Sequence, residues 1–160
     1  MQIKSLSIKN FKSIRFLEIK DVEKALIIVG KNNTGKTVVL DAIRAVIGDY
    51  TVKETDFNPK KQNIEIAMTL NLTQEDLKQF HICESVSKYK RFDTWERDFC
   101  DKLPSFSDGN ISFVCHINYN GQIRYHDGVH KNNRYILSIL PKLHFVDASR
   151  NLESLQDDLL

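Results

Sequence analysis

Apolar and polar residues alternate over several short stretches of this chain, which is the pattern of β-strands with one face buried in a core. The stretches lie at residues 3–11, 16–19, 64–72, 111–117 and 123–125. Between the last two, Asn120 and Gly121 supply the turn that tight hairpins favour. Residues 25–29 are all apolar, as in a strand covered on both faces, and residues 143–146 are expected to form a further buried strand.

Two helices are predicted from capping residues and from apolar residues at helical spacing. The first begins near Lys36 and ends before Gly48, because its apolar residues lie three or four positions apart. The second follows Thr73, an N-cap residue, with Asp76 completing a capping box.

Two other segments are less regular. Residues 84–109 are polar and weakly periodic, which predicts a mobile insertion holding a short helix at about residues 91–102. Further along, Pro141 is expected to stop a helix that Asn132 or Asn133 caps.

A length of 160 residues is enough for one domain with a core of its own. No apolar stretch reaches the roughly 18 to 20 residues that cross a membrane, and the N-terminus lacks the apolar block of a signal peptide. We therefore expect a cytoplasmic protein without a membrane partner. Net charge is only +2, yet residues 1–61 carry 12 basic and 7 acidic groups. This excess suits either a polyanionic ligand or a solvated surface of uneven charge.

Metal, thiol and base-stacking sites are weaker candidates. The three cysteines include no C-x-x-C pair, which argues against a disulfide framework, and we expect them to be buried apolar residues. Histidine spacing offers half of a zinc site at His126 and His130, while Cys115 and His116 point to opposite faces of a strand. Trp95 follows a basic stretch and either stacks on a base or, as we expect, packs a small helix onto the domain.

Residues 30–37 match the phosphate-binding pattern G-x-x-x-x-G-K-[ST] at every fixed position, between a predicted buried strand and a predicted helix. Glycine lets the backbone wrap a phosphate, and the amides at the start of the helix attract negative charge. Lys36, the predicted catalytic residue, is expected to reach the β- and γ-phosphates of ATP, and Thr37 to bind Mg²⁺. The predicted binding residues are Gly30, Lys31, Asn32, Asn33, Thr34, Gly35, Lys36 and Thr37.

The N-terminal sequence resembles that of ABC-type P-loop ATPases of the SMC/RecF group. The resemblance rests on residues 8–14 (IKNFKSI), 27–37 (IIVGKNNTGKT) and 40–43 (LDAI). Within that group the chain most resembles the OLD (overcoming lysogenization defect) family of ATP-dependent endonucleases. That branch is favoured by residues 54–57 (ETDF), 111–126 and 145–152 (FVDASRNL). The implied fold is α/β, the N-terminal lobe of an ABC-type ATPase, with a mixed β-sheet around the P-loop helix.

The resemblance also implies roles for residues outside the loop. Asn10 and Lys12 are expected near the nucleotide and its phosphates, although a solvated strand-end lysine is an equal alternative for Lys12. Asp56 lies where the Q-loop region approaches Mg²⁺, or else it is a turn residue.

The resemblance is incomplete. ABC-type heads also require a signature motif, a Walker B aspartate followed by a glutamate, and a switch histidine, none of which is recognisable; Ala148 follows Asp147 where the glutamate would stand. We therefore expect residues 1–160 to be the N-terminal part of a head domain whose C-terminal lobe is absent. Residues 1–57 would supply strands, P-loop and P-loop helix, and residues 58–160 the remaining sheet with a helical insertion at 73–109.

The function implied by the resemblance is ATP binding, with hydrolysis in a longer protein and little turnover by this chain alone. In an OLD-like protein the ATPase would gate DNA cleavage by a downstream Toprim nuclease, with DNA as a partner and the ATPase heads forming a homodimer or a higher homo-oligomer. An SMC/RecF-type DNA-repair or DNA-tethering clamp without nuclease activity is the alternative, and a bare nucleotide-binding module is a third possibility. A Toprim pattern downstream, long heptads, or neither would distinguish the three.

Overall fold

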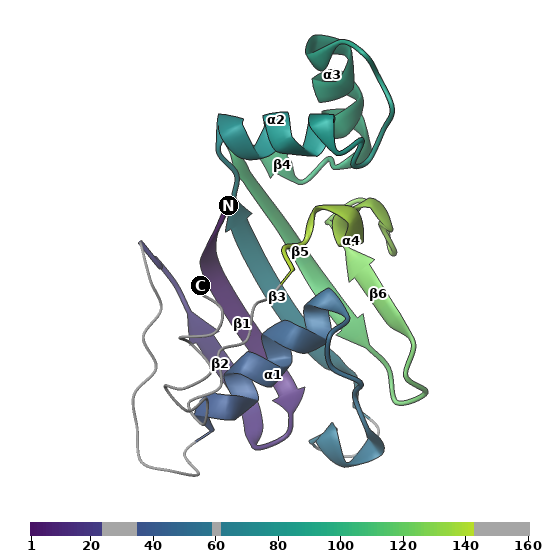
Figure 1. Cartoon of the computed structure of the whole chain (residues 1–160). Helices are drawn as coiled ribbons and strands as arrows, with labels where there is room; N and C mark the ends of the chain where they lie inside the picture. The colour runs from purple at the N-terminus through teal and green to yellow at the C-terminus, as the bar shows by residue number, and fades with distance from the viewer. Residues whose placement is uncertain (24–34, 59–61, 143–160) are drawn as a thin grey trace, which may run out of the picture.

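The computed structural model describes residues 1–23, 35–58 and 62–142 (Figure 1). In chain order its elements are β1 (Gln2–Phe11), β2 (Ile14–Ile19), α1 (Lys36–Ile47), a 3-10 turn (Glu54–Asp56), β3 (Ile64–Asn71), α2 (Gln74–Ile82), α3 (Phe92–Lys102), β4 (Phe106–Ser107), β5 (Asn110–Ile117), β6 (Ile123–His126) and α4 (Tyr135–Ile139). Every alternating stretch of the sequence is a strand, as predicted. The predicted strands at 25–29 and 143–146 lie outside the described residues.

The described strands form one sheet in the order β2-β1-β3-β5-β4, with β6 also paired to β5. The register between β3 and β5 is unbroken from Ile64 opposite Ile117 to Asn71 opposite Asn110. Along β3 every second residue is buried, which is why alternation in the sequence identified the strand. The predicted α/β fold class is confirmed, and the described part of its sheet is antiparallel throughout.

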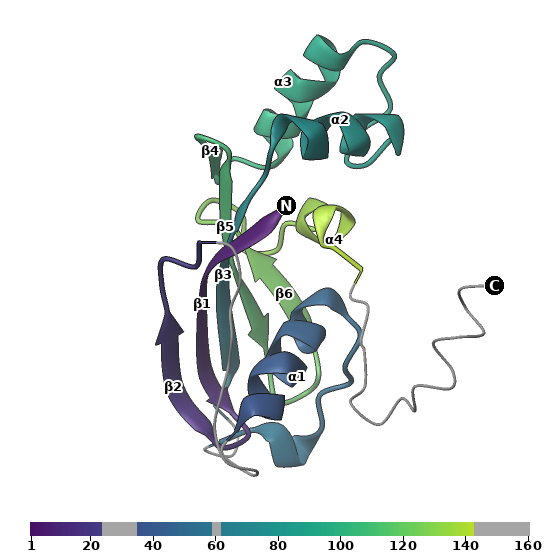
Figure 2. The ribbon, with the colours of Figure 1, turned by 60° about the vertical axis from the view of Figure 1, so that its left-hand side comes forward.

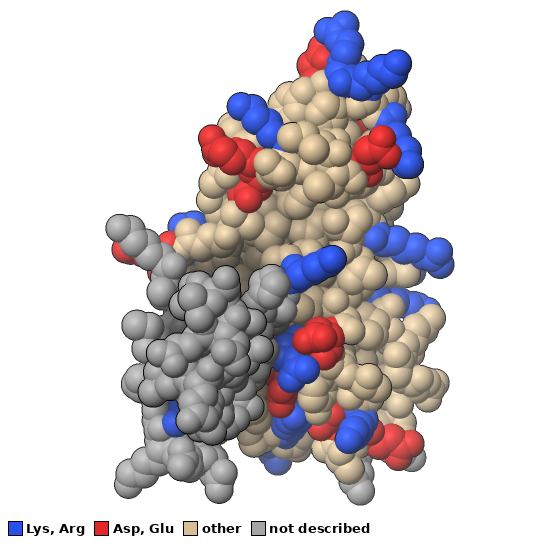
Figure 3. All heavy atoms as spheres, in the orientation of Figure 1, with Lys and Arg blue, Asp and Glu red and all other residues tan. Residues whose placement is uncertain are grey.

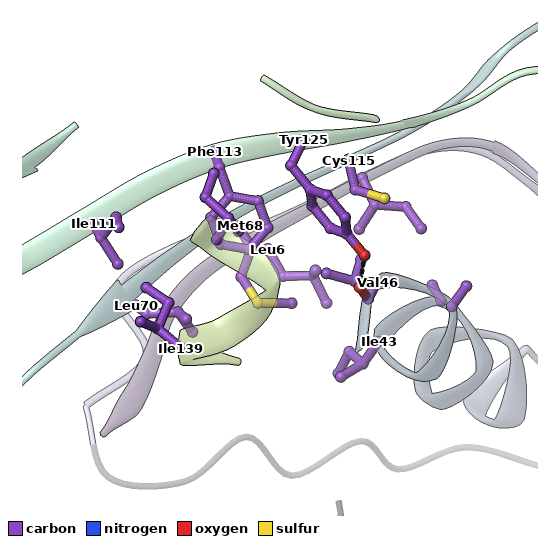
Figure 4. Close-up of a cluster of buried hydrophobic side chains, with 14 of the residues drawn as sticks. Leu6, Ile43, Val46, Met68, Leu70, Ile111, Phe113, Cys115, Tyr125 and Ile139 are labelled. Carbon is purple, nitrogen blue, oxygen red and sulfur yellow. Dashed lines mark hydrogen bonds between the residues drawn. The ribbon is translucent and has the colours of Figure 1, made fainter. Parts of the chain in front are cut away.

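Helices α1 and α4 cover one face of the sheet, and α2 and α3 lie beyond one of its ends (Figure 2). Core side chains fill the space between this face of the sheet and helices α1 and α4 (Figure 4). Within it, the Tyr125 hydroxyl of β6 donates a hydrogen bond of 2.6 Å to the carbonyl oxygen of Val46. That contact ties the C-terminal end of α1 to β6, the strand paired with β5.

Both predicted ends of α1 are confirmed. Gly48 follows the last helical residue with a φ of 84°, in the left-handed region that favours glycine. Its amide closes the helix by donating to the carbonyl oxygens of Ala45 and Arg44.

Helices α2 and α3 pack against each other as a helical pair through aromatic side chains and form the expected helical insertion, and its mobility stays a prediction. The capping box predicted at Thr73 and Asp76 is present, and the Asp76 carboxylate also lies 2.5 Å from the N-terminal ammonium group. Helix α3 coincides with the predicted 91–102 segment, and Trp95 and Phe99 are fully buried on one side of it. Two large aromatic residues four positions apart suffice to anchor a short helix, even though the remaining sequence is polar.

Helix α4 is shorter than predicted and has a different cap. Its N-cap is Arg134, not Asn132 or Asn133, and it ends at Ile139, before Pro141. Asn132 instead holds the loop to β6 by accepting from the amide of Tyr125. Asn133 accepts from the amide of Tyr135, the first residue of α4, so its side chain does bond to the helix start, from the position before the N-cap.

The cysteines differ from expectation in their exposure. Only Cys115 is buried, whereas Cys83 and Cys100 are exposed. Both exposed cysteines belong to the helical pair, whose small core is already filled by aromatic rings. No helix among the described residues is long and apolar enough to span a membrane.

Candidate nucleotide-binding site

The described part of the P-loop is its last three residues, Gly35, Lys36 and Thr37. The other predicted binding residues, Gly30, Lys31, Asn32, Asn33 and Thr34, lie outside the described residues. Helix α1 begins at Lys36, with Gly35 as its N-cap and Thr37 exposed in its first turn. The motif therefore stands at the beginning of a helix, as the sequence predicted.

The start of α1 suits a bound anion. Among the described residues no side chain caps it, and its first turn contains no acidic residue. The amides of a first helical turn have no partner within the helix, and the helix dipole places partial positive charge there. A phosphate group could accept hydrogen bonds from these amides.

Gly35 shapes the approach to this helix. Its φ of 90° lies in the left-handed region, where a side chain is strained. A Cβ at this position would lie 3.7 Å from the Ser13 Oγ atom. The turn between β1 and β2 therefore lies against the end of the P-loop.

Lys12, in the same turn, is held by α1. Its Nζ atom donates to Asp41 Oδ2 at 2.6 Å and lies 4.5 Å from the centre of the Tyr50 ring. Partial burial alone would lower the pKa of Lys12, but the hydrogen bonds to Asp41 and Tyr50 outweigh it, and the pKa is raised above its ordinary value. Asp41 lies one helical turn after Thr37, so Lys12 is brought close to the P-loop helix and remains charged.

Asn10 takes part in the backbone framework beside this turn. It has a φ of 61° and is buried, and its Nδ2 atom donates to the Asn63 carbonyl oxygen at 2.9 Å. Its own carbonyl oxygen accepts from the amide of Asn58 at 3.1 Å. These contacts join the end of β1 to the segment before β3.

Asp56 is buried under the same turn. Its Oδ2 atom accepts from the Tyr50 hydroxyl at 3.0 Å and from the Lys53 amide at 2.9 Å, and its carbonyl oxygen accepts from the Lys12 amide at 2.7 Å. These bonds are typical of a residue that shapes a turn, which was the alternative to metal binding. Its role toward Mg²⁺ stays a prediction.

Tyr50 and Asp41 are the members of this arrangement that sequence reasoning missed. Tyr50 joins Lys12 to Asp56, and Asp41 carries the charge that Lys12 meets. The sequence pattern gave no signal for Asp41, because at 100° per residue it lies on the side of the helix away from Val39, Ile43 and Val46; only the structure shows that it is buried. Tyr50 follows the helix in a short polar segment and likewise carries no signal.

The metal site suggested by the spacing of His126 and His130 is not formed in the described part of the structure. His130 Nδ1 lies 2.9 Å from the buried Asp127 carboxylate, away from any pairing with His126. Burial raises the pKa of the Cys115 thiol to about 12, so it stays protonated and is a poor metal ligand. Among the described residues no three histidine, cysteine or carboxylate groups are placed to share a metal ion.

Trp95 packs the helical pair and is not available to stack on a base. Its side chain is fully buried, and its Nε1 atom donates to the Ser85 carbonyl oxygen at 3.0 Å. Of the two alternatives left open by the sequence, the structure supports packing.

Residues 1–142 match the sequence family described as the AAA ATPase domain. No curated protein matches the chain.

Three solved structures are similar in fold. One comes from a study of the ATP-driven dimerization and DNA stimulated activation of SMC ATPases (TM-score 0.53, 17% identity, covering 86% of this chain and 76% of that one). Another is the SmcHead bound to the C-winged helix domain of ScpA (TM-score 0.56, 20% identity, covering 87% and 40%). The third is the Smc head domain with a coiled coil and joint from Pyrococcus yayanosii (TM-score 0.54, 20% identity, covering 86% and 24%). At these identities the similarity shows the fold alone. The chain spans less than half of the latter two.

Proposed function

Because the chain belongs to the AAA ATPase domain family and has the fold of SMC ATPase heads, we propose that residues 30–37 bind ATP together with Mg²⁺. The observation that carries this proposal is the start of α1. A complete phosphate-binding motif leads into an uncapped helix N-terminus, with a left-handed glycine at the junction. The family supplies the reaction class, and the described geometry suits the phosphates.

Within this site we assign each residue the role that its chemistry allows. Lys36 would neutralise the β- and γ-phosphate oxygens, and the Thr37 hydroxyl would bind Mg²⁺. The backbone amides of residues 30–35 would surround the phosphates, since glycine and small polar residues leave them accessible. When bound, Mg²⁺ would offset the negative charge of the triphosphate.

Lys12 is the strongest candidate outside the loop. Its ammonium group is positioned on α1 by Asp41, one turn from Thr37, so it adds positive charge beside the P-loop. Asn10 and Asp56 have side chains already bonded to Asn63, Tyr50 and Lys53. For these two we retain a contribution to the nucleotide and metal site as the weaker proposal.

The test is calorimetric titration of the 160-residue chain with MgATP. Lys36→Ala should abolish measurable binding, because the main positive charge facing the phosphates is lost. Lys78→Ala, an exposed lysine on the helical pair, is the control and should bind like the parent. Turnover by the chain alone should be negligible. Equal affinity of Lys36→Ala and the parent would rule out the P-loop assignment.

For the whole protein we propose an OLD-like ATPase that gates DNA cleavage by a downstream Toprim domain. The resemblance of residues 54–57 and 145–152 to that family supports this choice. The chain would be the N-terminal part of a head domain, and hydrolysis would require the C-terminal lobe and a second head. ATP-dependent dimerisation of the complete heads would then be detectable by light scattering.

A DNA-repair or DNA-tethering clamp of the SMC/RecF type is the second candidate, and the shared fold with SMC heads favours it. Reading the coding sequence past codon 160 separates the two. An acidic Toprim pattern after a signature motif and a Walker B motif supports the nuclease. Long heptad stretches support the clamp, and neither pattern supports a nucleotide-binding module that signals to a partner.

A further inference from the structure

A basic pocket of about 370 Å³ lies on the β5–β6 hairpin, and none of its lining residues belongs to the P-loop motif. Four of its lining residues carry or can carry positive charge: His116, Arg124, His126 and Lys131. The other three are amides, Asn63, Asn118 and Gln122. Every side chain that lines this pocket is therefore a potential hydrogen-bond donor, and none is a carboxylate.

The strand register brings the basic residues together. His116 of β5 lies directly opposite Arg124 of β6, and His126 lies opposite Val114, two positions away. Paired residues of an antiparallel sheet share a face, and residues two apart on one strand do so as well. The rings of His116 and His126 are accordingly 6.3 Å apart. This face is the one opposite α1, because the alternate residues Cys115 and Tyr125 are buried in the core.

The loop after β6 holds its end of the pocket in place. The Gly128 amide donates to His126 Nδ1 at 3.0 Å, so in the neutral ring the proton is on Nε2, which can then donate. The buried Asp127 carboxylate accepts from the Val129 and His130 amides, the His130 ring and the Asn133 amide group. The loop that carries Lys131 is thus pre-organised without any ligand.

The positive charge of the pocket is not neutralised by nearby carboxylates. Neither Arg124 nor Lys131 makes an ion pair with any acidic residue in the described part of the chain. Among the described residues the carboxylate that makes an ion-pair contact with this group is Glu65, whose Oε1 atom is 4.0 Å from His116 Nδ1 and whose Oε2 atom also pairs with Lys9 at 3.4 Å. On the face that carries α1, by contrast, acidic and basic side chains are interspersed (Figure 3).

We propose that this pocket binds a phosphate-class oxyanion, either a free phosphate group or the backbone phosphate of a nucleic acid. Arginine, lysine and histidine donors around a space without carboxylates are the recognition chemistry of phosphate groups. A metal cation is disfavoured, because two permanent positive charges line the space and His126 Nδ1 is already occupied. None of the lining residues belongs to the P-loop motif, so this proposal does not rest on the nucleotide proposal.

The experiment is an NMR titration of the 160-residue chain in a Lys36→Ala background, which silences the P-loop. Inorganic phosphate is added in one series and a short single-stranded DNA oligonucleotide in another, and the His116 and His126 ring signals are followed. We expect both rings to respond in at least one series. The double variant Arg124→Gln and Lys131→Gln should weaken that binding about tenfold or more.

A second double variant, Lys78→Gln and Lys90→Gln, removes the same net charge from exposed positions on the helical pair and should bind like the parent. A response to phosphate alone identifies a small anionic ligand, and a response to DNA alone identifies backbone contact. Absence of any ring response, or an equal loss of affinity in both double variants, overturns the proposal.

Discussion

Asp41 is the residue on which the charge balance beside the P-loop helix depends. Its carboxylate lies 2.6 Å from Lys12 Nζ and 3.7 Å from Arg44 Nη1, and its own side chain is only 12% exposed. Asp41→Asn would remove the carboxylate that Lys12 contacts, while Arg44 keeps its shorter ion pair with Asp49. Because the cations are partly solvated, we expect the free energy of unfolding in urea to fall by only about 1–2 kcal/mol.

The reciprocal change, at Lys12, should lower the free energy of unfolding by a smaller amount. Lys12→Met leaves Asp41 with Arg44, so we expect a smaller loss than for Asp41→Asn. The two single variants and the double variant form a cycle that measures the pairwise coupling. Strictly additive losses would mean that the short contact between Lys12 and Asp41 contributes nothing to stability.

Asp127 should give the fold a distinctive dependence on pH. Burial alone would raise the pKa of its carboxyl, but hydrogen bonds from Asn133, His130 and two backbone amides outweigh it and hold the pKa well below its usual range. A lowered folded-state pKa contributes stability above the unfolded value of about 3.9, and this contribution is lost as the pH falls toward the folded value.

Asp127→Asn should therefore lower the free energy of unfolding by about 2 kcal/mol at pH 7, since amide donors then face amide donors. The difference in free energy of unfolding between Asp127→Asn and the parent should narrow progressively below about pH 4. Urea unfolding at several pH values measures both effects. Asp101→Asn, at an exposed position on α3, is the control, and a gap that stays constant with pH would contradict the assignment.

The two ends of α1 provide a matched pair at the scale of an element. Gly35 and Gly48 have φ values of 90° and 84°, so alanine is strained at both. Among the described atoms, a Cβ at Gly48 meets nothing within 4 Å, and one at Gly35 meets Ser13 Oγ at an ordinary 3.7 Å. We expect each alanine variant to cost about 1–2 kcal/mol of stability.

Their effects on nucleotide binding should differ. Gly35→Ala disturbs the backbone where the phosphates are proposed to bind, whereas Gly48→Ala acts at the opposite end of the helix. MgATP affinity should therefore fall in Gly35→Ala and stay unchanged in Gly48→Ala, as measured by calorimetry. A similar loss in both variants would indicate that the effect arises from stability and not from the phosphate site.

Elements were predictable where a local pattern has a single physical cause. Strict alternation in β3 follows from one buried face, and Thr73 and Gly48 mark helix ends because their backbone chemistry is specific. Helix α3 was harder, since its stability depends on Trp95 and Phe99 packing within a polar sequence. The N-cap of α4 is Arg134, one position after Asn133, although Asn133 Oδ1 still accepts from the Tyr135 amide while its Nδ2 atom donates to the Lys102 carbonyl oxygen and to Asp127.

At the scale of the molecule, contacts between residues distant in sequence were not predictable from one chain. Lys12 and Asp41 are 29 positions apart. In the basic pocket, His116, Arg124 and His126 come together through the register of β5 and β6. Periodicity reports which face a residue occupies, but not which residue of another element it meets. The proposed phosphate-binding motif could be recognised because its pattern is contained in eight consecutive residues, whereas the side chains described around it belong to other segments.

The bond between Tyr125 and Val46 is the contact that makes α1 and the hairpin parts of one core (Figure 4). The last carbonyl groups of a helix have no partner within it, and the Tyr125 hydroxyl supplies one to Val46 from 79 positions away. Burial raises the pKa of Tyr125 above its usual value, so the phenol remains a donor throughout the ordinary pH range.

Tyr125→Phe keeps the ring in the core and removes only this donor, leaving a buried carbonyl oxygen unsatisfied. We expect the free energy of unfolding to fall by about 1–2 kcal/mol, in the range of a lost buried hydrogen bond. Amide hydrogen exchange should also speed up in the last turn of α1, while β1 and β3 stay protected. The exposed Tyr89→Phe variant should match the parent in both measurements. If exchange in α1 is unchanged, the helix end is held by packing alone and the hydroxyl does not join it to the sheet.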